Sequence, residues 1–196
     1  MGIKKVVRPC CLTFILGDIM VSKRLKLCYI SEDYINYLRK FDKKVCFNKN
    51  NTRPYVGIVY AFGKQKYFAP LSSPKPKHKW MDNSTIDIWL IDGGKLGMIN
   101  FNNMIPTPSS ELSDVVSIIE DIKYKKLLEN QLTLINRRRN EIIKKCLNFR
   151  YQYDKKRLSP NIMNRCCNFK MLEKKCYEYM YLKRKNQFVK KLKTFW

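Results

Sequence analysis

The chain has 196 residues and a formal net charge of +24, because 40 lysines and arginines stand against 16 aspartates and glutamates. Hydrophobic residues make up 45% of the sequence, which supports a packed core and argues against a globally disordered chain. Such a charge repels itself unless a polyanion neutralises it, so nucleic acid is the first candidate partner and an anionic membrane surface is the second.

The first 24 residues are basic and contain one short apolar run at residues 10–16. This order faintly resembles a secretory signal, but no small-residue cleavage motif follows, and the run is too short to span a bilayer. We therefore interpret residues 1–24 as a basic N-terminal extension. Met20 offers an alternative start, in which case residues 1–19 are not native.

The chain contains eight cysteines and a single histidine. No Cys-x-x-Cys pair occurs, and one histidine cannot complete the common zinc patterns. We interpret the cysteines as small apolar residues in a reducing cytosol, and we expect a cytoplasmic protein that uses no metal and no cofactor.

The chain up to about residue 105 has the pattern of an antiparallel meander with one inserted helix. Ser31 is the expected N-cap of that helix, which has acids in its first turn and runs to about Phe41. β-Branched and aromatic runs separated by turns at Gly63-Lys64 and at residues 92–95 mark the strands. The expected strands are residues 25–30, 55–62, 65–71, 86–91 and 96–101.

The second half has a helical period, although residues 112–119 fit either a strand or a helix. From Ile122 to Tyr153 apolar residues recur at spacings of three, four or seven, which predicts one long helix with a basic opposite face. Ser159-Pro160 supplies the cap and the first position of another helix, expected to reach about Tyr181.

A sheet followed by helices indicates an α+β fold, in which a helical C-terminal half packs on a small curled antiparallel sheet or barrel. We expect a single domain at residues 25–180 and a basic-aromatic tail at residues 181–196.

Residues 72–78 read Ser-Ser-Pro-Lys-Pro-Lys-His and are called the proline turn below. Each proline fixes its own φ angle and pushes the preceding residue into an extended conformation, so Ser73 and Lys75 should be extended and held. A rigid turn with two hydroxyls, two lysines and a histidine is suited to grip and polarise a phosphate. The alternative is a proline-rich surface loop without function.

We consider which of three mechanisms of phosphodiester cleavage the residues of this chain could support. Metal-dependent nucleases need clustered carboxylates, and Asp82, Asp87 and Asp92 form no recognisable metal motif. A Ser-His-Asp triad would depend on His78 as a base in a basic loop. RNA carries its own nucleophile, the 2′-hydroxyl, so a lysine that exchanges protons and hydroxyl or guanidinium groups that stabilise the phosphorane are chemically sufficient.

Several separated motifs, in the same order, resemble the ToxN/AbiQ family of toxins from type III toxin–antitoxin and abortive-infection systems. The most distinctive is Tyr-Phe-Ala-Pro-Leu-Ser-Ser-Pro-Lys at residues 67–75. The other segments are residues 29–38, 41–42, 53–59, 96–100, 104–106, 124–132 and 166–173.

The resemblance implies a fold similar to the MazF/Kid barrel with added helices. It implies a metal-independent endoribonuclease that leaves a 2′,3′-cyclic phosphate and acts on cellular or phage RNA during abortive infection. It also implies inhibition by a small repeated pseudoknot RNA, assembled with the toxin into a closed protein–RNA complex.

The matching motifs imply an active groove formed by Tyr34, Arg53, Ser72, Ser73 and Lys75. We expect Ser73 and Lys75 to bind the scissile phosphate, Lys75 to exchange a proton, and Ser72 to position the nucleotide. Arg53 stands where the family is expected to carry lysine, and a permanently charged arginine favours charge stabilisation over proton transfer. Tyr34 either contacts a base or phosphate or simply packs its helix.

The antitoxin RNA is expected to bind basic groups along the helical half and the tail. The candidate RNA-binding residues are Lys77, His78, Arg137, Arg138, Arg139, Lys144 and Lys145. For each basic run the alternative is a solvated helix face, and for His78 it is plain solvent exposure. Two rival functions remain open: a non-catalytic RNA-binding protein and a peripheral membrane protein that uses the tail.

Overall fold

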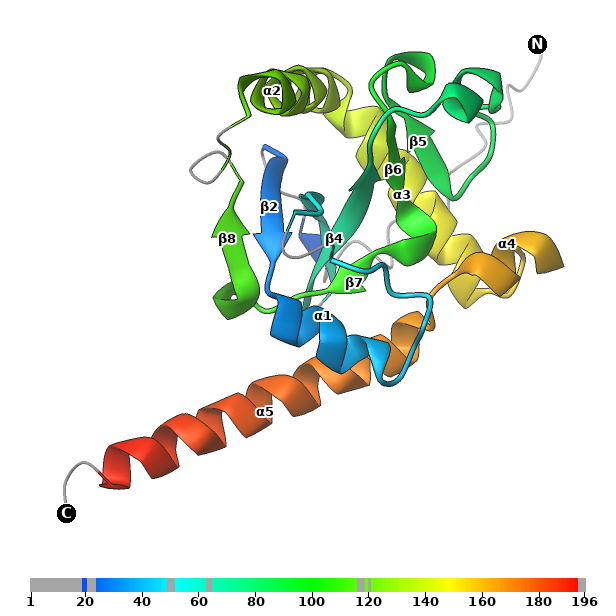
Figure 1. Ribbon diagram of the computed structural model, residues 1–196. Helices are drawn as coiled ribbons and strands as arrows, with labels where there is room; N and C mark the ends of the chain where they lie inside the picture. Colours follow the sequence, from blue (N-terminus) through cyan, green and yellow to red (C-terminus); the bar gives the residue numbers. More distant parts are fainter. Residues whose placement is uncertain are drawn as a thin grey trace, which may run out of the picture.

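The computed structural model describes residues 19–20, 24–48, 52–62, 65–115, 119 and 121–193. An antiparallel sheet forms the body of the molecule, and helices from the second half of the chain surround it (Figure 1). The strands are β1 Ile19–Met20, β2 Lys26–Ile30, β3 Tyr55–Phe62, β4 Gln65–Ser72, β5 Ile88–Leu90, β6 Met98–Asn100, β7 Ile105–Pro106 and β8 Leu112–Asp114. The helices are α1 Glu32–Arg39, α2 Ile122–Arg137, α3 Arg139–Asp154, α4 Pro160–Arg165 and α5 Phe169–Lys193, with 3₁₀ turns η2 Pro76–Trp80, η3 Ile91–Gly94, η4 Phe101–Asn103 and η5 Ser109–Glu111.

The strand order is β5-β6-β4-β3-β2-β8, and β1 and β7 pair with β3 and β4 beside this path. The centre is the β3–β4 pair, whose register runs from Tyr55 opposite Pro70 to Phe62 opposite Gln65, with an irregularity between Gly57 and Tyr60. In the described part of the chain the end strands β5 and β8 do not pair with each other, so the sheet is open and the expected barrel is not closed. The α+β class is confirmed, and the likeness to MazF/Kid stays a prediction.

The helix cap predicted in the first half is confirmed, and the strands there are confirmed in part. The Ser31 hydroxyl caps α1 by accepting from the Tyr34 amide, and α1 buries Tyr34, Ile35 and Leu38 in the core. The expected strands at residues 86–91 and 96–101 are shorter than predicted, because η3 occupies the connection with Asp92 and Gly93 at positive φ. Of the ambiguous stretch at residues 112–119, the first three residues form strand β8. The expected Gly63-Lys64 turn lies outside the described residues.

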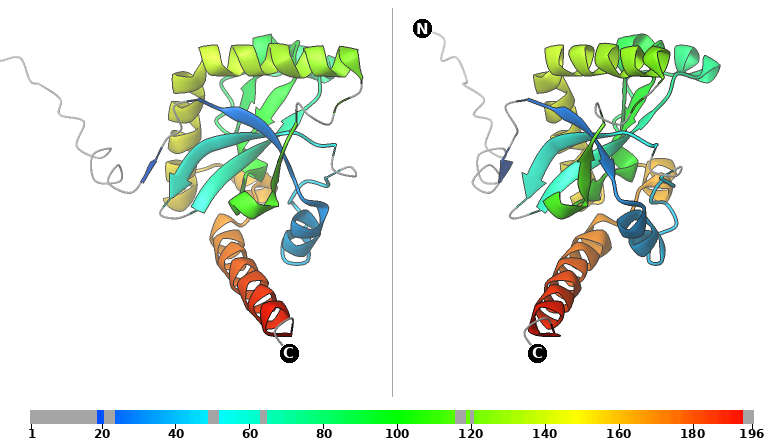
Figure 2. Two further views of the ribbon diagram at one scale, coloured as in Figure 1. Left: turned by 90° about the vertical axis from the view of Figure 1, so that its left-hand side faces the viewer. Right: turned by 60° about the vertical axis from the view of Figure 1, so that its left-hand side comes forward.

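The single long helix predicted from Ile122 is wrong, because the chain bends at Arg138 and forms α2 and α3, which run in different directions (Figure 2). The two helices cover different parts of the sheet. In α2, Gln131 Nε2 donates to the Leu96 carbonyl at 2.5 Å. Ile135 and Ile142, on either side of the bend, are both buried. The apolar spacing therefore continues through the bend and does not reveal it.

The second predicted helix is also two helices. Pro160 begins α4 as expected, but the Ser159 side chain makes no capping hydrogen bond. The chain leaves the helical path between α4 and α5 because two backbone amides bond elsewhere. The Cys167 amide donates to the Asn102 carbonyl at 2.8 Å, and the Asn168 amide donates to the Asp42 carboxylate at 2.7 Å. Long-range partners thus compete with helix continuation at this point.

A buried polar cluster ties α3 and α5 to the sheet, and we call it the Arg150 cluster. Arg150 Nη1 donates to the hydroxyls of Tyr60 and Tyr67 at 2.8 Å each. Its Nη2 pairs with Glu173 at 2.7 Å, and its Nε pairs with Asp154 at 2.8 Å. The rings of Tyr60 and Tyr67 are stacked with centroids 4.6 Å apart. One guanidinium therefore joins two strands and two helices.

Six of the eight cysteines lie in the described part of the chain and are free thiols. Five of them are buried, which confirms their interpretation as small apolar core residues: Cys28, Cys146, Cys166, Cys167 and Cys176. Burial, with a smaller effect from Asp114, raises the pKa of the Cys28 thiol to about 12, so this thiol is protonated at neutral pH. None of the helices in the described residues is both long and apolar enough to cross a membrane.

Candidate functional site

The proline turn leaves the sheet at the end of β4, where Ser72 is the last strand residue. Asn100 on the neighbouring strand β6 donates through Nδ2 to the Ser72 hydroxyl at 3.0 Å and to the Pro70 carbonyl at 3.1 Å. Because Asn100 occupies an acceptor position of that hydroxyl, the Ser72 O–H remains a donor. Asn100 belongs to one of the segments that carry the family resemblance, so the sequence contained a signal for it that was not used.

Ser73 and Lys75 follow on the exposed side of the turn. Lys75 has φ −137° and ψ 148°, which confirms the extended conformation predicted for a residue before proline. Within the described part of the chain, the side chains of Ser73, Lys75 and Lys77 have no hydrogen-bond or ion-pair partner. A hydroxyl and two ammonium groups are therefore presented to solvent on a restrained backbone.

The turn is supported from behind by Gly97, which has φ +97°. A Cβ atom at this position would lie 2.1 Å from the Ser72 carbonyl oxygen, so both the angle and the close approach require glycine. Ile91 donates its amide to the Gly97 carbonyl at 2.9 Å, which fixes this support to η3.

His78 is buried, and neither ring nitrogen has a hydrogen-bond partner within the described residues. Both sequence interpretations, an RNA contact and plain solvent exposure, are wrong because the imidazole has no exposed surface. The backbone amide of His78 donates to the Lys75 carbonyl at 2.9 Å, so His78 holds the turn in place. Burial, and then the charges of Lys77 and Lys75, lower the pKa of the imidazole.

Arg53 reaches the site from the residues before β3. Its Nη1 donates to the Leu71 carbonyl at 3.4 Å, one residue before Ser72, and its Nε donates to the Phe47 carbonyl at 2.6 Å. Burial, and then Tyr29, raise the pKa of the Tyr124 hydroxyl on α2, and the nearby charge of Arg53 opposes this shift. The structure thus brings Arg53 to the C-terminal end of β4, where Ser72, Ser73 and Lys75 follow one another in the chain, with Tyr124 nearby.

Tyr34 does not belong to this group. Its side chain is fully buried, and its hydroxyl donates to the Pro106 carbonyl at 2.6 Å. The ring packs edge-on against Tyr179 with centroids 4.9 Å apart. The proposed contact with a base or phosphate is therefore wrong for this conformation, and the alternative, packing of the α1 face, is what the structure shows.

The remaining predicted RNA-binding residues gather at the corner between α2 and α3. Arg137 and Arg138 are exposed at the bend, and Arg138 pairs with Glu141 at 2.8 Å. Lys145 is half-buried, donates to the Asn83 carbonyl and lies with Nζ 5.6 Å from the centre of the Trp89 ring. Arg139 is half-buried at the start of α3, and Lys144 is exposed further along the same helix.

The buried carboxylate of Asp87 is paired with an arginine of the fold. Asp87 is buried and accepts from Arg165 Nε and Nη2 at 2.7 and 2.8 Å. In the part of the chain that the structure describes, no three His, Cys, Asp or Glu side chains form a group that could hold a metal ion. The site residues described above are cations and hydroxyls, which bind anions and form no set of metal ligands.

Comparison with known proteins identifies the family. Residues 26–177 match the family model described as Toxin ToxN, type III toxin–antitoxin system. The chain belongs to the ToxN family. It is similar to Endoribonuclease ToxN of Bacillus thuringiensis subsp. kurstaki, with 34% identity over 76% of this chain and 81% of the relative. It is also similar to Endoribonuclease ToxN of Pectobacterium atrosepticum, with 32% identity over 79% of this chain and 94% of the relative.

Solved structures of ToxN-family proteins agree with this fold. The structure of AbiQ, described as a lactococcal anti-phage endoribonuclease of the type III toxin–antitoxin system, matches with a TM-score of 0.66 at 30% identity and covers 81% of this chain and 99% of that chain. A second structure, described in terms of selective toxin inhibition by a non-coding RNA pseudoknot, matches with a TM-score of 0.68 at 30% identity and covers 80% of this chain and 98% of that chain.

Proposed function

We propose that this ToxN-family chain is an endoribonuclease toxin that cleaves RNA without a metal ion. The RNA 2′-hydroxyl attacks the adjacent phosphorus, the bond to the 5′-oxygen breaks, and the products carry a 2′,3′-cyclic phosphate and a 5′-hydroxyl. The observation that carries the proposal is the proline turn, where Ser73 and Lys75 are exposed and have no partner among the described residues, on a backbone held by Asn100, Gly97 and His78.

Each group has a role that its environment permits. Ser73 and Lys75 bind the scissile phosphate, and Lys75 exchanges the proton that must leave the 2′-oxygen or reach the 5′-oxygen. The Ser72 hydroxyl positions the nucleotide by donating a hydrogen bond, since Asn100 already donates to its oxygen. Arg53 stays charged throughout and stabilises the extra negative charge on the phosphorane.

The proposed partner is a small repeated RNA that folds as a pseudoknot and blocks the toxin within a closed protein–RNA complex in the cytoplasm. The pseudoknot inhibitor of the related toxin and the anti-phage activity of AbiQ support this assignment. Release of the toxin during phage infection would then lead to RNA cleavage and abortive infection. Arg137, Arg138, Arg139, Lys144 and Lys145 are the groups proposed to contact the antitoxin phosphates.

Incubation of the purified protein with RNA in excess chelator tests the proposed chemistry. We expect cleavage to continue and the 5′ fragment to end in a cyclic phosphate, which acid opens to a mixture of 2′- and 3′-phosphates. RNA in which every 2′-hydroxyl is methylated should bind but remain intact. Binding without cleavage of unmodified RNA would instead support the rival function, a non-catalytic RNA-binding protein.

A further inference from the structure

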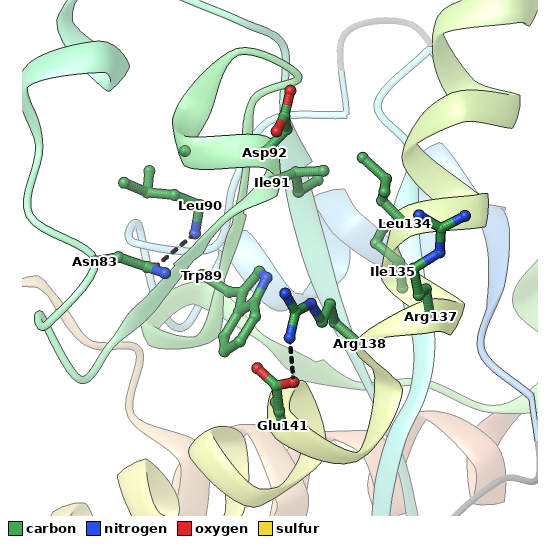
Figure 3. Close-up of a pocket in the computed structure, with 11 residues that line it drawn as sticks. Asn83, Trp89, Leu90, Ile91, Asp92, Leu134, Ile135, Arg137, Arg138 and Glu141 are labelled. Carbon is green, nitrogen blue, oxygen red and sulfur yellow. Dashed lines mark hydrogen bonds and ion pairs between the residues drawn. The ribbon is translucent and has the colours of Figure 1, made fainter.

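A cavity of about 370 Å³ lies between strand β5, turn η3 and the corner of α2 and α3 (Figure 3). We propose that it is a nucleobase pocket, which receives one unstacked base of a bound RNA. The inference rests on the proposed function, because it names a subsite for the same RNA ligand. Its volume is in the range of pockets that enclose small ligands.

The pocket contains the side chains that recognise an unstacked base. Trp89 is half-buried, and its backbone is fixed because β5 pairs with β6 in the register Trp89 opposite Ile99. In Figure 3 the indole of Trp89 and the guanidinium of Arg138 point toward one another. A planar base that enters here can stack on both groups, and single-stranded RNA is typically held in this way.

The rim supplies charge of both signs. Arg137 is exposed beside the pocket and has no partner within the described residues, so it is available to a phosphate. Asp92 and Glu141 also line the pocket, and their carboxylates can accept hydrogen bonds from base N–H groups. The ion pair between Arg138 and Glu141 is exposed, with side chains 62% and 54% accessible, so a ligand can open it at small energetic cost.

The pocket and the proline turn share one structural element. Ile91, Asp92 and Gly93 of η3 line the pocket, and the next residue, Gly94, packs so closely on His78 that a Cβ atom would lie 2.5 Å from the His78 carbonyl oxygen. An RNA strand that contacts both sides of η3 would have one base in the pocket and a phosphate near Lys75. The pocket would therefore set the register of the strand at the cleavage site.

Fluorescence of Trp89 tests the proposal directly. The chain has three tryptophans, so Trp80→Phe and Trp196→Phe leave Trp89 as the only indole. This protein is titrated with 2′-O-methyl RNA hexamers of A, G, C or U, which cannot supply the nucleophile, while anisotropy of a label on the RNA reports binding. We expect saturable quenching of Trp89 emission that follows the anisotropy for at least one hexamer.

Variants distinguish RNA binding through the pocket from general electrostatic attraction of RNA to the basic protein. Trp89→Leu and Arg138→Gln should each weaken binding of the quenching hexamer about tenfold, whereas Trp89→Phe, which retains a stacking ring, should stay within about threefold. Arg157→Gln removes the same charge just beyond the C-terminal end of α3 and should change binding less than about twofold. Thermal unfolding of each variant confirms that it is folded.

The outcomes show separately whether the nucleobase pocket or the proposed function is wrong. Anisotropy that rises without any change in Trp89 emission, or equal losses from Arg138→Gln and Arg157→Gln, would overturn the pocket while RNA cleavage still stands. A protein that neither binds nor cleaves RNA would overturn the proposed function, and the pocket with it.

Discussion

The Arg150 cluster and the proline turn show two uses of positive charge in one molecule. The guanidinium of Arg150 is 11% exposed and is paired with two carboxylates and two tyrosine hydroxyls. In contrast, Lys75 on the proline turn is exposed and has no partner within the described residues. Both groups sit on firmly held backbone, so flexibility does not distinguish them.

The difference lies in which partners the fold supplies. A buried cation must be neutralised within the protein, because an unpaired buried charge costs several kcal/mol. Arg150 therefore joins elements of the fold and is not available to a ligand. Lys75 keeps its binding capacity because the fold restrains its backbone, and no described residue pairs with its ammonium group. The comparison predicts that replacement of Arg150 will lower the stability of the fold, whereas replacement of Lys75 will lower activity.

The largest expected effect is that of Lys75→Ala on activity. Removal of the proton-transferring and phosphate-binding ammonium should reduce RNA cleavage by about 10²- to 10⁴-fold and leave the unfolding free energy unchanged within about 0.5 kcal/mol. Single-turnover cleavage of a labelled RNA and urea unfolding measure the two quantities. Lys79→Ala, which removes an exposed lysine of the adjoining turn η2, is the matched control and should cleave normally. Undiminished cleavage by Lys75→Ala would remove this residue from the mechanism.

Arg150→Leu is the converse test and should act on stability. The change leaves the half-buried Glu173 without a cationic partner, although the Tyr67 hydroxyl still donates to it, and it deprives Tyr60 of its hydrogen-bond partner. We therefore expect a loss of about 3–5 kcal/mol in the free energy of unfolding. Urea titration followed by circular dichroism measures it. Arg157→Leu, an exposed arginine, should change stability by no more than about 0.5 kcal/mol. If the two variants are equally stable, the Arg150 cluster is not what holds α3 and α5 on the sheet.

Gly97→Ala tests whether the restrained backbone of the proline turn matters. Its Cβ atom would collide with the Ser72 carbonyl, so we expect a loss of about 1–3 kcal/mol in stability and about a tenfold decrease in cleavage. Gly93→Ala separates the clash from the backbone strain, because Gly93 also has positive φ but nothing lies within 4 Å of its Cβ position. Gly93→Ala should cost about 1 kcal/mol. Equal costs for the two variants would show that the contact with Ser72 is not restrictive.

The smallest expected effect concerns pH and His78. The pKa of the buried imidazole is lowered from its ordinary value of 6.5, so below pH 6.5 the unfolded chain binds more protons than the folded chain. The stability contribution of His78 is therefore fully present above pH 6.5 and decreases as the pH falls toward the folded pKa. One proton limits the slope to about 1.4 kcal/mol per pH unit. Lys75 and Lys77 oppose protonation of the ring.

Urea unfolding between about pH 5 and pH 8 measures this dependence, with His78→Leu as the comparison because it removes the titrating group. We expect the wild-type protein to lose stability relative to His78→Leu as the pH decreases. Parallel pH profiles for the two proteins would show that protonation of His78 does not act on the proline turn.

Local features of this protein could be predicted from the sequence because their causes lie within a few residues. The Ser31 cap, the extended Lys75 before a proline, the position of the η3 turn and the core strands β3 and β4 all follow from neighbours in the chain. The order of family motifs likewise indicated the proline turn as the candidate site, which stays a prediction. In each case the deciding steric or hydrogen-bonding group is adjacent in sequence, so the pattern is sufficient.

Only the tertiary structure decided which polar groups are buried and where the helices bend. His78 is six residues from Ser72 and three from Lys75, yet it is fully buried, and its backbone packs on Gly94 of η3. The Tyr34 hydroxyl donates to a carbonyl 72 residues away. The break before α5 depends in the same way on a carboxylate 126 residues distant from Asn168. Contacts between residues so far apart in the sequence depend on the whole fold, so a local pattern of residue types cannot predict them.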